Sequence, residues 1–267
     1  MKSIRRQSRS ALRCVAAGLL ASILPLLCGA ADARTLAEVK SLGAISICAN
    51  PDALPHSSSK DSEQAGFQVE IARAIAQDLG VKLNVEWILP RRRANVVNCD
   101  MMLDTINDPP VYEGRLLISQ PYNKTGIALG LRRDAQGISD FHDLKKGQKV
   151  GVMVGSISSM VLGKRHVTIS PYAFQIDMLE DLIKGELFGA AVSPATLGYY
   201  IRQHPEAGLK MLNAYDSEPE LSWSVTVGLR KSDQALLSEV NRILSTLIAD
   251  GTITRIYDKY GIEHRLP

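Results

Sequence analysis

Hydrophobic residues recur along the chain with two different periods, and their order predicts the elements of the fold. The apolar residues 44–49 predict a buried strand that ends at the Asn50-Pro51 turn. The next segment predicts one buried helical face from apolar residues four positions apart, namely Phe67, Ile71, Ile75 and Leu79. Gly80 would end that helix, and alternating apolar residues over 81–87 predict a second strand. This order of strand, helix and strand favours a parallel pair with a right-handed crossover.

A second set of elements follows the same scheme later in the chain. Residues 149–154 predict a strand that runs into a helix start rich in hydroxyl groups at 155–159. Residues 175–184 predict a helix ended by Gly185, and residues 188–192 predict a buried strand. Two such sets exceed a typical small domain, so the pattern predicts an α/β protein with two lobes. An amphipathic helix that Gly251 interrupts closes the chain, while the polar residues 56–66 predict a mobile surface loop.

The first 33 residues have the composition of a secretory signal peptide. Five basic residues precede an uncharged stretch at residues 14–30, and small residues follow it up to Ala33. Because this stretch is short for a membrane span, we expect an exported, periplasmic protein with no stable membrane insertion after cleavage. The leader carries five of the 31 basic residues and one of the 28 acidic residues, which leaves 26 against 27. A nearly neutral mature chain gives no reason to expect nucleic acid or an anionic surface as a partner.

Two cysteines, Cys48 and Cys99, remain after the leader is removed. In an exported protein, with each one beside a predicted strand, a disulfide explains them most simply. It would close a loop of about fifty residues and contribute about 3 to 4 kcal/mol in the chain-entropy treatment. A metal site is disfavoured because the five histidines show no ligand spacing with each other or with the cysteines. A catalytic thiol stays open as an alternative, although it would have to remain reduced outside the cytoplasm.

Five segments resemble, in this order, the family 3 solute-binding proteins of bacterial ABC importers. They span nearly all of the chain after the leader and read GFQVEIARAIAQDLGVKL, LISQPYNKTGIALGLRRD, ISDFHDLKKGQKVGVMVGS, DMLEDLIKGELFGAAV and LIADGTITRIYDKYGI. The resemblance implies the two-lobed periplasmic-binding-protein fold of type II, in which each lobe has a central sheet flanked by helices and two crossing strands join the lobes. It also implies a first lobe of residues 34–124 and 227–267, a second lobe of residues 125–226, and a ligand in the cleft between them.

Open α/β sheets bind ligands outside the carboxyl ends of their strands. By the resemblance, segments 50–55, 105–115, 155–159 and 193–196 would line the cleft. The candidate ligand-binding residues are Asp52, Leu54, Tyr112, Arg115, Gly155, Ser156, Ser158 and Ser193. Two of them have plainer explanations, since Asp52 suits a turn cap and Ser156 suits a helix cap whether or not anything binds. Trp87 and Trp223 are interpreted as core residues rather than as ligand platforms.

Four shorter segments are similar to the solute-binding proteins that accompany periplasmic quinoprotein alcohol or methanol dehydrogenases. They read CANPDALP, VEWILPRRR, NCDMML and LGYYIRQ, and the matching residues are Cys48, Trp87, Arg91, Arg92, Cys99 and Asp100. The segment between Arg93 and Cys99 is shorter than in that group. The likeness implies an accessory role beside a dehydrogenase that uses pyrroloquinoline quinone, with the arginines at 91–93 facing an acidic partner.

Amino-acid binders of the family hold the ligand carboxylate with an arginine after the third strand and the ammonium group with an acid in the second lobe. Counting back from Pro121-Tyr122, the arginine position falls on or near Tyr112, and Arg115 lies three residues further on. Residues 192–200 contain no carboxylate. A zwitterion without both anchors would be buried with unpaired charges, at a cost of several kcal/mol. A small neutral or weakly anionic ligand is therefore expected in place of an amino acid.

Three functions are consistent with these patterns. The first is a non-catalytic accessory factor of a quinoprotein dehydrogenase, and the second is a binding subunit that delivers a solute to an ABC permease. The third is an enzyme on the same scaffold, for which Asp52 and Asp104 are the nearest acids, although neither has a recognisable partner. We favour the first and expect no cofactor and no metal.

Overall fold

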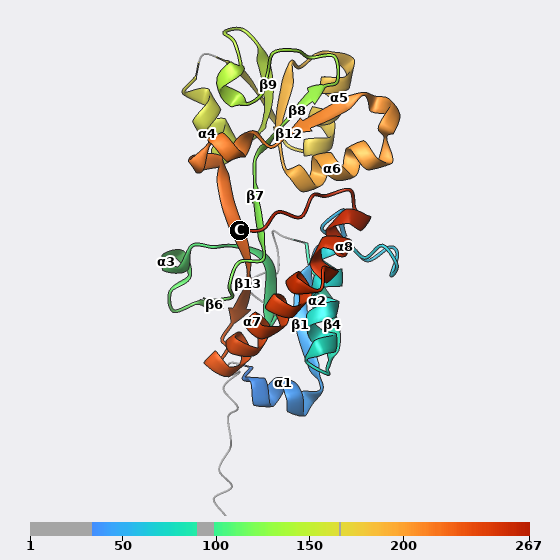
Figure 1. Ribbon diagram of the computed structural model, residues 1–267, viewed down its shortest axis with the longest axis vertical. Helices are drawn as coiled ribbons and strands as arrows, with labels where there is room; N and C mark the ends of the chain where they lie inside the picture. The colour runs from blue at the N-terminus through green and yellow to red at the C-terminus, as the bar shows by residue number, and fades with distance from the viewer. Residues whose placement is uncertain (1–33, 90–98, 166) are drawn as a thin grey trace, which may run out of the picture. The chain divides into compact units, whose positions relative to one another are not determined.

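A computed structural model describes residues 34–89, 99–165 and 167–267, which form two main β-sheets with helices packed on their faces (Figure 1). The predicted signal peptide, residues 1–33, and the arginines at 91–93 lie outside the described residues. Among the residues that are described, no helix is both long enough and apolar enough to cross a membrane.

The first sheet has the strand order β4-β1-β5-β13-β6, and β7 also pairs with β13. Its strands are β1 (Ala44–Ala49), β4 (Lys82–Trp87), β5 (Met101–Ile106), β6 (Leu116–Ile118), β7 (Asn123–Gly126) and β13 (Ser222–Arg230). Strand β1 runs parallel to β4 and β5, whereas β13 is antiparallel to β5, β6 and β7. The parallel pair predicted from residues 44–49 and 81–87 is confirmed.

The helices of the first lobe pack on this sheet, and all of them except the short α3 contribute buried residues to one core. They are α1 (Leu36–Leu42), α2 (Phe67–Asp78), α3 (Pro109–Tyr112), α7 (Gln234–Ala249) and α8 (Thr252–Lys259). The predicted face of α2 is confirmed, because all four of its residues at four-residue spacing are buried. Gly251 adopts φ 75° between α7 and α8, a left-handed conformation that ends the long helix as expected.

The second sheet has the order β10-β9-β11-β8-β12. Its strands are β8 (Ala128–Arg132), β9 (Lys149–Met153), β10 (Thr168–Tyr172), β11 (Gly189–Val192) and β12 (Leu209–Leu212). The helices are α4 (Ile157–Gly163), α5 (Gln175–Lys184) and α6 (Pro194–Gln203), with short 3₁₀ turns η1 (Phe141–Asp143), η2 (Pro205–Ala207), η3 (Ala214–Ser217) and η4 (Pro219–Leu221). Both faces of strand β11 are covered by core residues. Ala191 belongs to the core that includes Val161 of α4, and Ala190 belongs to the core that includes Met178 of α5.

Two antiparallel segments connect the sheets. Strand β7 leads directly into β8, and β13 enters the first sheet after η4. Residues Ser222, Trp223, Ser224 and Val225 of β13 pair with the four residues of β7. These are the two crossing strands of the predicted fold. The expected lobe boundaries after residues 124 and 226 fall within them and remain predictions.

Cys48 and Cys99 form a disulfide with a Cα–Cα distance of 5.6 Å. The bond joins the end of β1 to the segment that leads into β5, across 51 residues of sequence. Beside it, Asp100 accepts hydrogen bonds from the backbone N–H and the hydroxyl of Ser46, both at 2.7 Å. The predicted disulfide is therefore present, and neither a metal site nor a free thiol is needed to explain the two cysteines.

Two local predictions are wrong. Residues 56–66 are not a mobile surface loop throughout, because β3 (Ser57–Ser58) pairs with β2 (Asp52–Ala53) and both serines are buried. Trp87 is not a core residue, since it is 39% exposed at the end of the edge strand β4. Leu83 and Val85 of that strand pack on the core, whereas Trp87 lies beyond it.

Candidate functional site

A cavity of about 170 Å³ lies beside the crossing strands. Residues from the first lobe and residues from the second lobe, such as Ser193 and Pro194, both line it. Its ionisable side chains are Asp104, Glu263, His56 and Lys124, and its aromatic walls are Phe67, Tyr215, Trp223 and Tyr257. A concave site with a few convergent polar groups among aromatic rings is a typical site for a small ligand.

Asp104 reaches this cavity because of an irregularity in β5. Strand β13 pairs Thr226 with Thr105 and Gly228 with Met102, so β5 carries one extra residue between the two pairs. Asp104 lies in that bulge with φ 54°, a left-handed conformation that is costly for a residue other than glycine. Bulges of this kind redirect a side chain out of the regular alternation of the strand.

Two side chains of the first lobe hold the Asp104 carboxylate. The Tyr122 hydroxyl donates to Oδ1 at 2.6 Å, and the Gln68 amide donates to Oδ2 at 2.7 Å. The Asp104 backbone N–H donates back to the Tyr122 hydroxyl at 3.1 Å. Burial, with the charge of Asp104, raises the pKa of Tyr122 well above its ordinary value, so the phenol keeps its proton and remains a donor. Each carboxylate oxygen thus accepts one protein hydrogen bond and keeps acceptor capacity for a ligand.

His56 contributes little positive charge to the cavity at neutral pH. Burial lowers the pKa of its imidazole, and the nearby Asp104 carboxylate opposes this effect only in part. The ring packs against Phe67, with 5.0 Å between the ring centroids. A neutral His56 leaves the negative charge of Asp104 available to a ligand.

We expect His56→Gln to reduce the acid sensitivity of the fold. The pKa of His56 is lower in the folded protein than its unfolded value of about 6.5. As the pH falls through that value, the unfolded chain takes up the proton first, and the wild type loses stability that the glutamine variant retains. The loss is at most about 1.4 kcal/mol for each unit by which the pKa is lowered.

Urea unfolding at pH 7.5 and pH 5 measures the difference. His142→Gln is the control, and an equal loss in wild type and His56→Gln would contradict the expectation.

The other two ionisable groups are partly engaged within the protein. Lys124 Nζ lies 3.2 Å from Asp216 Oδ1. Glu263 accepts a hydrogen bond from the Asn213 amide at 3.0 Å. With His56 neutral, two acids and one paired lysine line the cavity, so its charge balance favours a cation. The four aromatic rings add to this preference, because a positive group is attracted to a ring face.

Of the eight predicted ligand-binding residues, only Ser193 lines this cavity. Asp52 is exposed and pairs with Lys60 at 2.8 Å. Leu54 lines a separate cavity of about 180 Å³ with Ile176, Thr196, Tyr199, Tyr200, Gln203 and His204. Leu54 and Ser193 therefore line different cavities, and a common ligand site for these three residues remains a prediction.

The other predicted residues also lie elsewhere. Tyr112 ends α3 half-buried, and Arg115 lines a third cavity with Gly114, Leu116, Leu117, Lys231 and Ser232. Ser156 caps α4 by accepting a hydrogen bond from the Ser159 N–H, and Ser158 is buried with its hydroxyl 2.8 Å from that of Ser156. Gly155 is exposed with φ 68°. Their roles in ligand binding remain predictions, and for Ser156 the cap accounts for the geometry.

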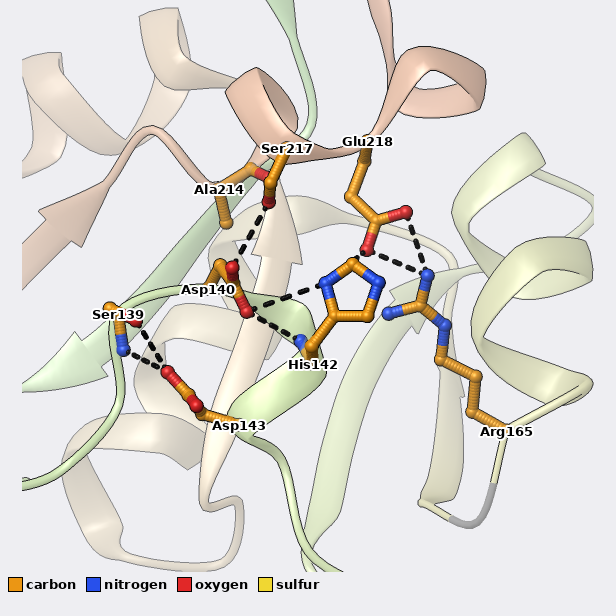
Figure 2. A network of polar contacts seen from close by, with 8 residues as sticks. All are labelled: Ser139, Asp140, His142, Asp143, Arg165, Ala214, Ser217 and Glu218. Atoms are coloured by element: carbon orange, nitrogen blue, oxygen red, sulfur yellow. Dashed lines mark hydrogen bonds and ion pairs between the residues drawn. The ribbon is translucent and has the colours of Figure 1, made fainter.

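A second polar network lies inside the second lobe, around Glu218 (Figure 2). Arg165 Nη2 donates to both carboxylate oxygens of Glu218, at 2.6 and 2.7 Å, and His142 Nδ1 lies 3.3 Å from Oε1. Ser217 donates to Asp140 at 3.2 Å. Because Arg165 and His142 both contact the Glu218 carboxylate within the second lobe, we interpret this network as structural. It fixes the short turns η3 and η4 to the rest of the second lobe.

Sequence reasoning missed most of the cavity. It considered Asp104 only as an acid for an enzyme and interpreted Trp223 as core, whereas both line the cavity. Trp223 also packs against the core of the first lobe, so that interpretation was half right. The signal available for Asp104 was an acid inside an otherwise apolar strand, which is unusual enough to mark a site. No comparable signal marked Glu263.

The sequence profile of the bacterial extracellular solute-binding proteins, family 3, matches residues 45–263. A probable amino-acid ABC transporter-binding protein of Haemophilus influenzae is 23% identical over 202 residues, 74% of this chain and 76% of its own length. A probable histidine-binding protein of Neisseria gonorrhoeae is 24% identical over 258 residues, which cover 92% and 94% of the two chains. The structure of an ancestral cationic amino acid solute-binding protein, 23% identical, superposes with a TM-score of 0.71 over 85% of this chain and 99% of the other. This last likeness shows the fold.

Proposed function

Because the chain belongs to the bacterial extracellular solute-binding proteins of family 3, we propose that it binds a small cationic, amine-bearing solute beside its crossing strands and delivers it to an ABC permease. The observation that carries the proposal is the Asp104 carboxylate, held at the cavity wall by Tyr122 and Gln68. An oriented carboxylate in a partly dry site binds a cation more strongly than the same group in water.

A basic amino acid, or an amine derived from one, is the ligand class that we favour. The expectation that disfavoured amino acids depended on two sequence positions, near Tyr112 and near Ser193. The cavity offers the two kinds of anchor at other positions: Asp104 and Glu263 can accept from ammonium groups, and Lys124 can donate to a carboxylate. The names of the Haemophilus and Neisseria relatives, which refer to amino acids and to histidine, support this reassignment.

A thermal-shift screen followed by calorimetry tests the proposal. The panel contains arginine, lysine and histidine, the amine from each by decarboxylation, glutamate, short alcohols and pyrroloquinoline quinone. A ligand at one hundred times its Kd adds about 2.7 kcal/mol to stability, which raises Tm by about 5 to 10 °C for a chain of this size. We expect that rise for at least one cationic compound. A rise only for glutamate, an alcohol or the quinone would refute the proposal.

The accessory role beside a quinoprotein dehydrogenase remains a separate prediction. It depended on segments that include the arginines at 91–93, which lie outside the described residues, and the relatives above are named for amino acids. Pull-down from periplasm with a tagged mature chain separates the two roles. Recovery of a dehydrogenase without any permease would favour the accessory role over transport.

An enzymatic role remains a further alternative on the same cavity. Asp104 would be its base, since the second acid considered from the sequence, Asp52, is exposed and lies outside the cavity. Consumption of a panel compound that stops in Asp104→Asn would support that role. Binding without consumption supports the transport role.

A further inference from the structure

The C-terminal segment, residues 261–265, runs from the end of α8 to the crossing strand β7 (Figure 1). The Lys124 backbone N–H donates to the Arg265 carbonyl at 2.6 Å. His264 Nε2 lies 2.8 Å from the Tyr122 carbonyl oxygen, and Nδ1 lies 2.8 Å from the Thr254 hydroxyl. These contacts fix the segment to the first lobe, on the strand that leads into the second.

The same segment reaches the second lobe through two side chains. Arg265 Nη2 lies 2.8 Å from Asp216, and Nη1 donates to the Tyr215 hydroxyl at 2.9 Å. The Arg265 guanidinium also lies 5.3 Å from the centre of the Tyr215 ring. Glu263 accepts from the Asn213 amide at 3.0 Å. In the ion pair with Asp216, the Arg265 side chain is 26% exposed and the Asp216 side chain is 40% exposed.

Helix α6 of the second lobe approaches the start of this segment closely. A Cβ atom added to Gly198 would lie 2.4 Å from the Gly261 carbonyl oxygen, and one added to Gly261 would lie 2.8 Å from Arg202 Cβ. Gly261 has φ 73°, which glycine adopts without strain. Two glycines thus allow backbone contact between α6 and the segment, a second meeting point with the second lobe.

The turn that Arg265 contacts is itself held within the second lobe. Asn213, Tyr215 and Asp216 belong to η3 or adjoin it, and the network in Figure 2 ties η3 to η1 through Ser217 and Asp140. A force on η3 is therefore transmitted to the second lobe as a body. Of the two side chains that Arg265 contacts, Tyr215 lines the ligand cavity, and Glu263 of the same C-terminal segment lines it as well.

We propose that residues 261–265 form a third connection between the lobes, in which Arg265 restrains the hinge and positions the cavity wall through Tyr215 and Asp216. Rotation of the lobes that separates η3 from this segment has to break the Arg265 ion pair and the contact with the Tyr215 ring. The ion pair forms a restraint of limited strength, so the hinge can still open. Arg265 is a positioning residue, because its side chain acts on the cavity through Tyr215. The proposal goes beyond ligand binding and does not depend on which solute binds.

The distance between the lobes tests this connection without any ligand. Spin labels are attached to cysteines introduced by Arg73→Cys on α2 and Glu180→Cys on α5, two exposed positions in different lobes. The distance distribution is measured by pulsed electron spin resonance in the otherwise wild-type protein, in Arg265→Ala and in Arg242→Ala. Arg242 is the matched control, since it forms ion pairs with Asp78 and Glu239 inside the first lobe, at 2.6 and 2.9 Å.

We expect Arg265→Ala to broaden the distribution or shift its centre, and Arg242→Ala to leave it unchanged. For a cationic ligand found in the screen, Arg265→Ala should also increase the dissociation rate about threefold or more. Arg265→Lys, which keeps the charge but loses the paired donors, should fall between the two. An unchanged distribution in Arg265→Ala, or an equal change in Arg242→Ala, would overturn the proposal. The spin-label experiment needs no ligand. It therefore still tests the connection between the lobes if the proposed ligand class is wrong.

Discussion

Asp104→Asn should weaken the binding of a cationic ligand by about 2 to 5 kcal/mol, or roughly 30-fold to several thousand-fold in Kd. The substitution keeps the size of the side chain and removes its charge. The asparagine oxygen can still accept from the Tyr122 hydroxyl, but its NH2 group cannot accept from Gln68, whose amide has to turn its own oxygen toward it. The ligand's positive group is left without its main partner. The bulge in β5 should persist, because asparagine tolerates the left-handed conformation that this position requires.

Calorimetric titration of the variant with the strongest ligand of the screen measures this effect. Asp52→Asn is the matched control, since it removes an acid that is exposed and paired with Lys60. Exposed pairs of this kind contribute about 0 to 1 kcal/mol, so its Kd should change little. Equal affinities of wild type and Asp104→Asn, or a larger loss in Asp52→Asn, would place the ligand elsewhere.

Replacement of both cysteines by serine should lower the free energy of unfolding by about 4 kcal/mol. The disulfide closes a loop of 51 residues, and the chain-entropy treatment assigns about that value to a loop of this length. The corresponding fall in Tm is about 8 to 16 °C for a chain of this size. The variant should still fold, because Asp100 ties the same two segments together through Ser46.

Calorimetric unfolding of the oxidised wild type and of the Cys48→Ser, Cys99→Ser double variant measures the difference. Wild type unfolded in the presence of a reductant should resemble the double variant, since both lack the crosslink. A fall in Tm of less than about 2 °C in both would show that the crosslink does not constrain the unfolded chain.

The fold was predictable where one local pattern was sufficient. Helices α2 and α5 follow from apolar spacing and from the glycines that end them, and the strand pair β1 and β4 follows from the helix that connects them. Trp87 shows the limit of this reasoning. An alternating pattern tells which face of a strand is apolar, but it does not tell how far along an edge strand the covering helix extends.

The candidate site was hard to predict because distant parts of the chain form it. Asp104 enters the cavity through a bulge that exists only against β13, about 120 residues later in the sequence. Glu263 and the Arg265 contacts come from a tail that lies beside β7. Counting back from Pro121-Tyr122 assumed that the ligand anchors keep their usual sequence positions, and this assumption led to Tyr112 and Arg115 on and beside α3. The residues that we propose for binding an amine are far apart in the sequence, and only the three-dimensional arrangement brings them to one cavity.

The crystal structure of the protein with its strongest ligand tests the central claim most directly. We predict density for the ligand in the cavity beside β7 and β13, with its positive group within hydrogen-bonding distance of the Asp104 carboxylate and near at least one of the four aromatic rings. A ligand bound at Ser156 and Tyr112, without contact to Asp104, would contradict the claim.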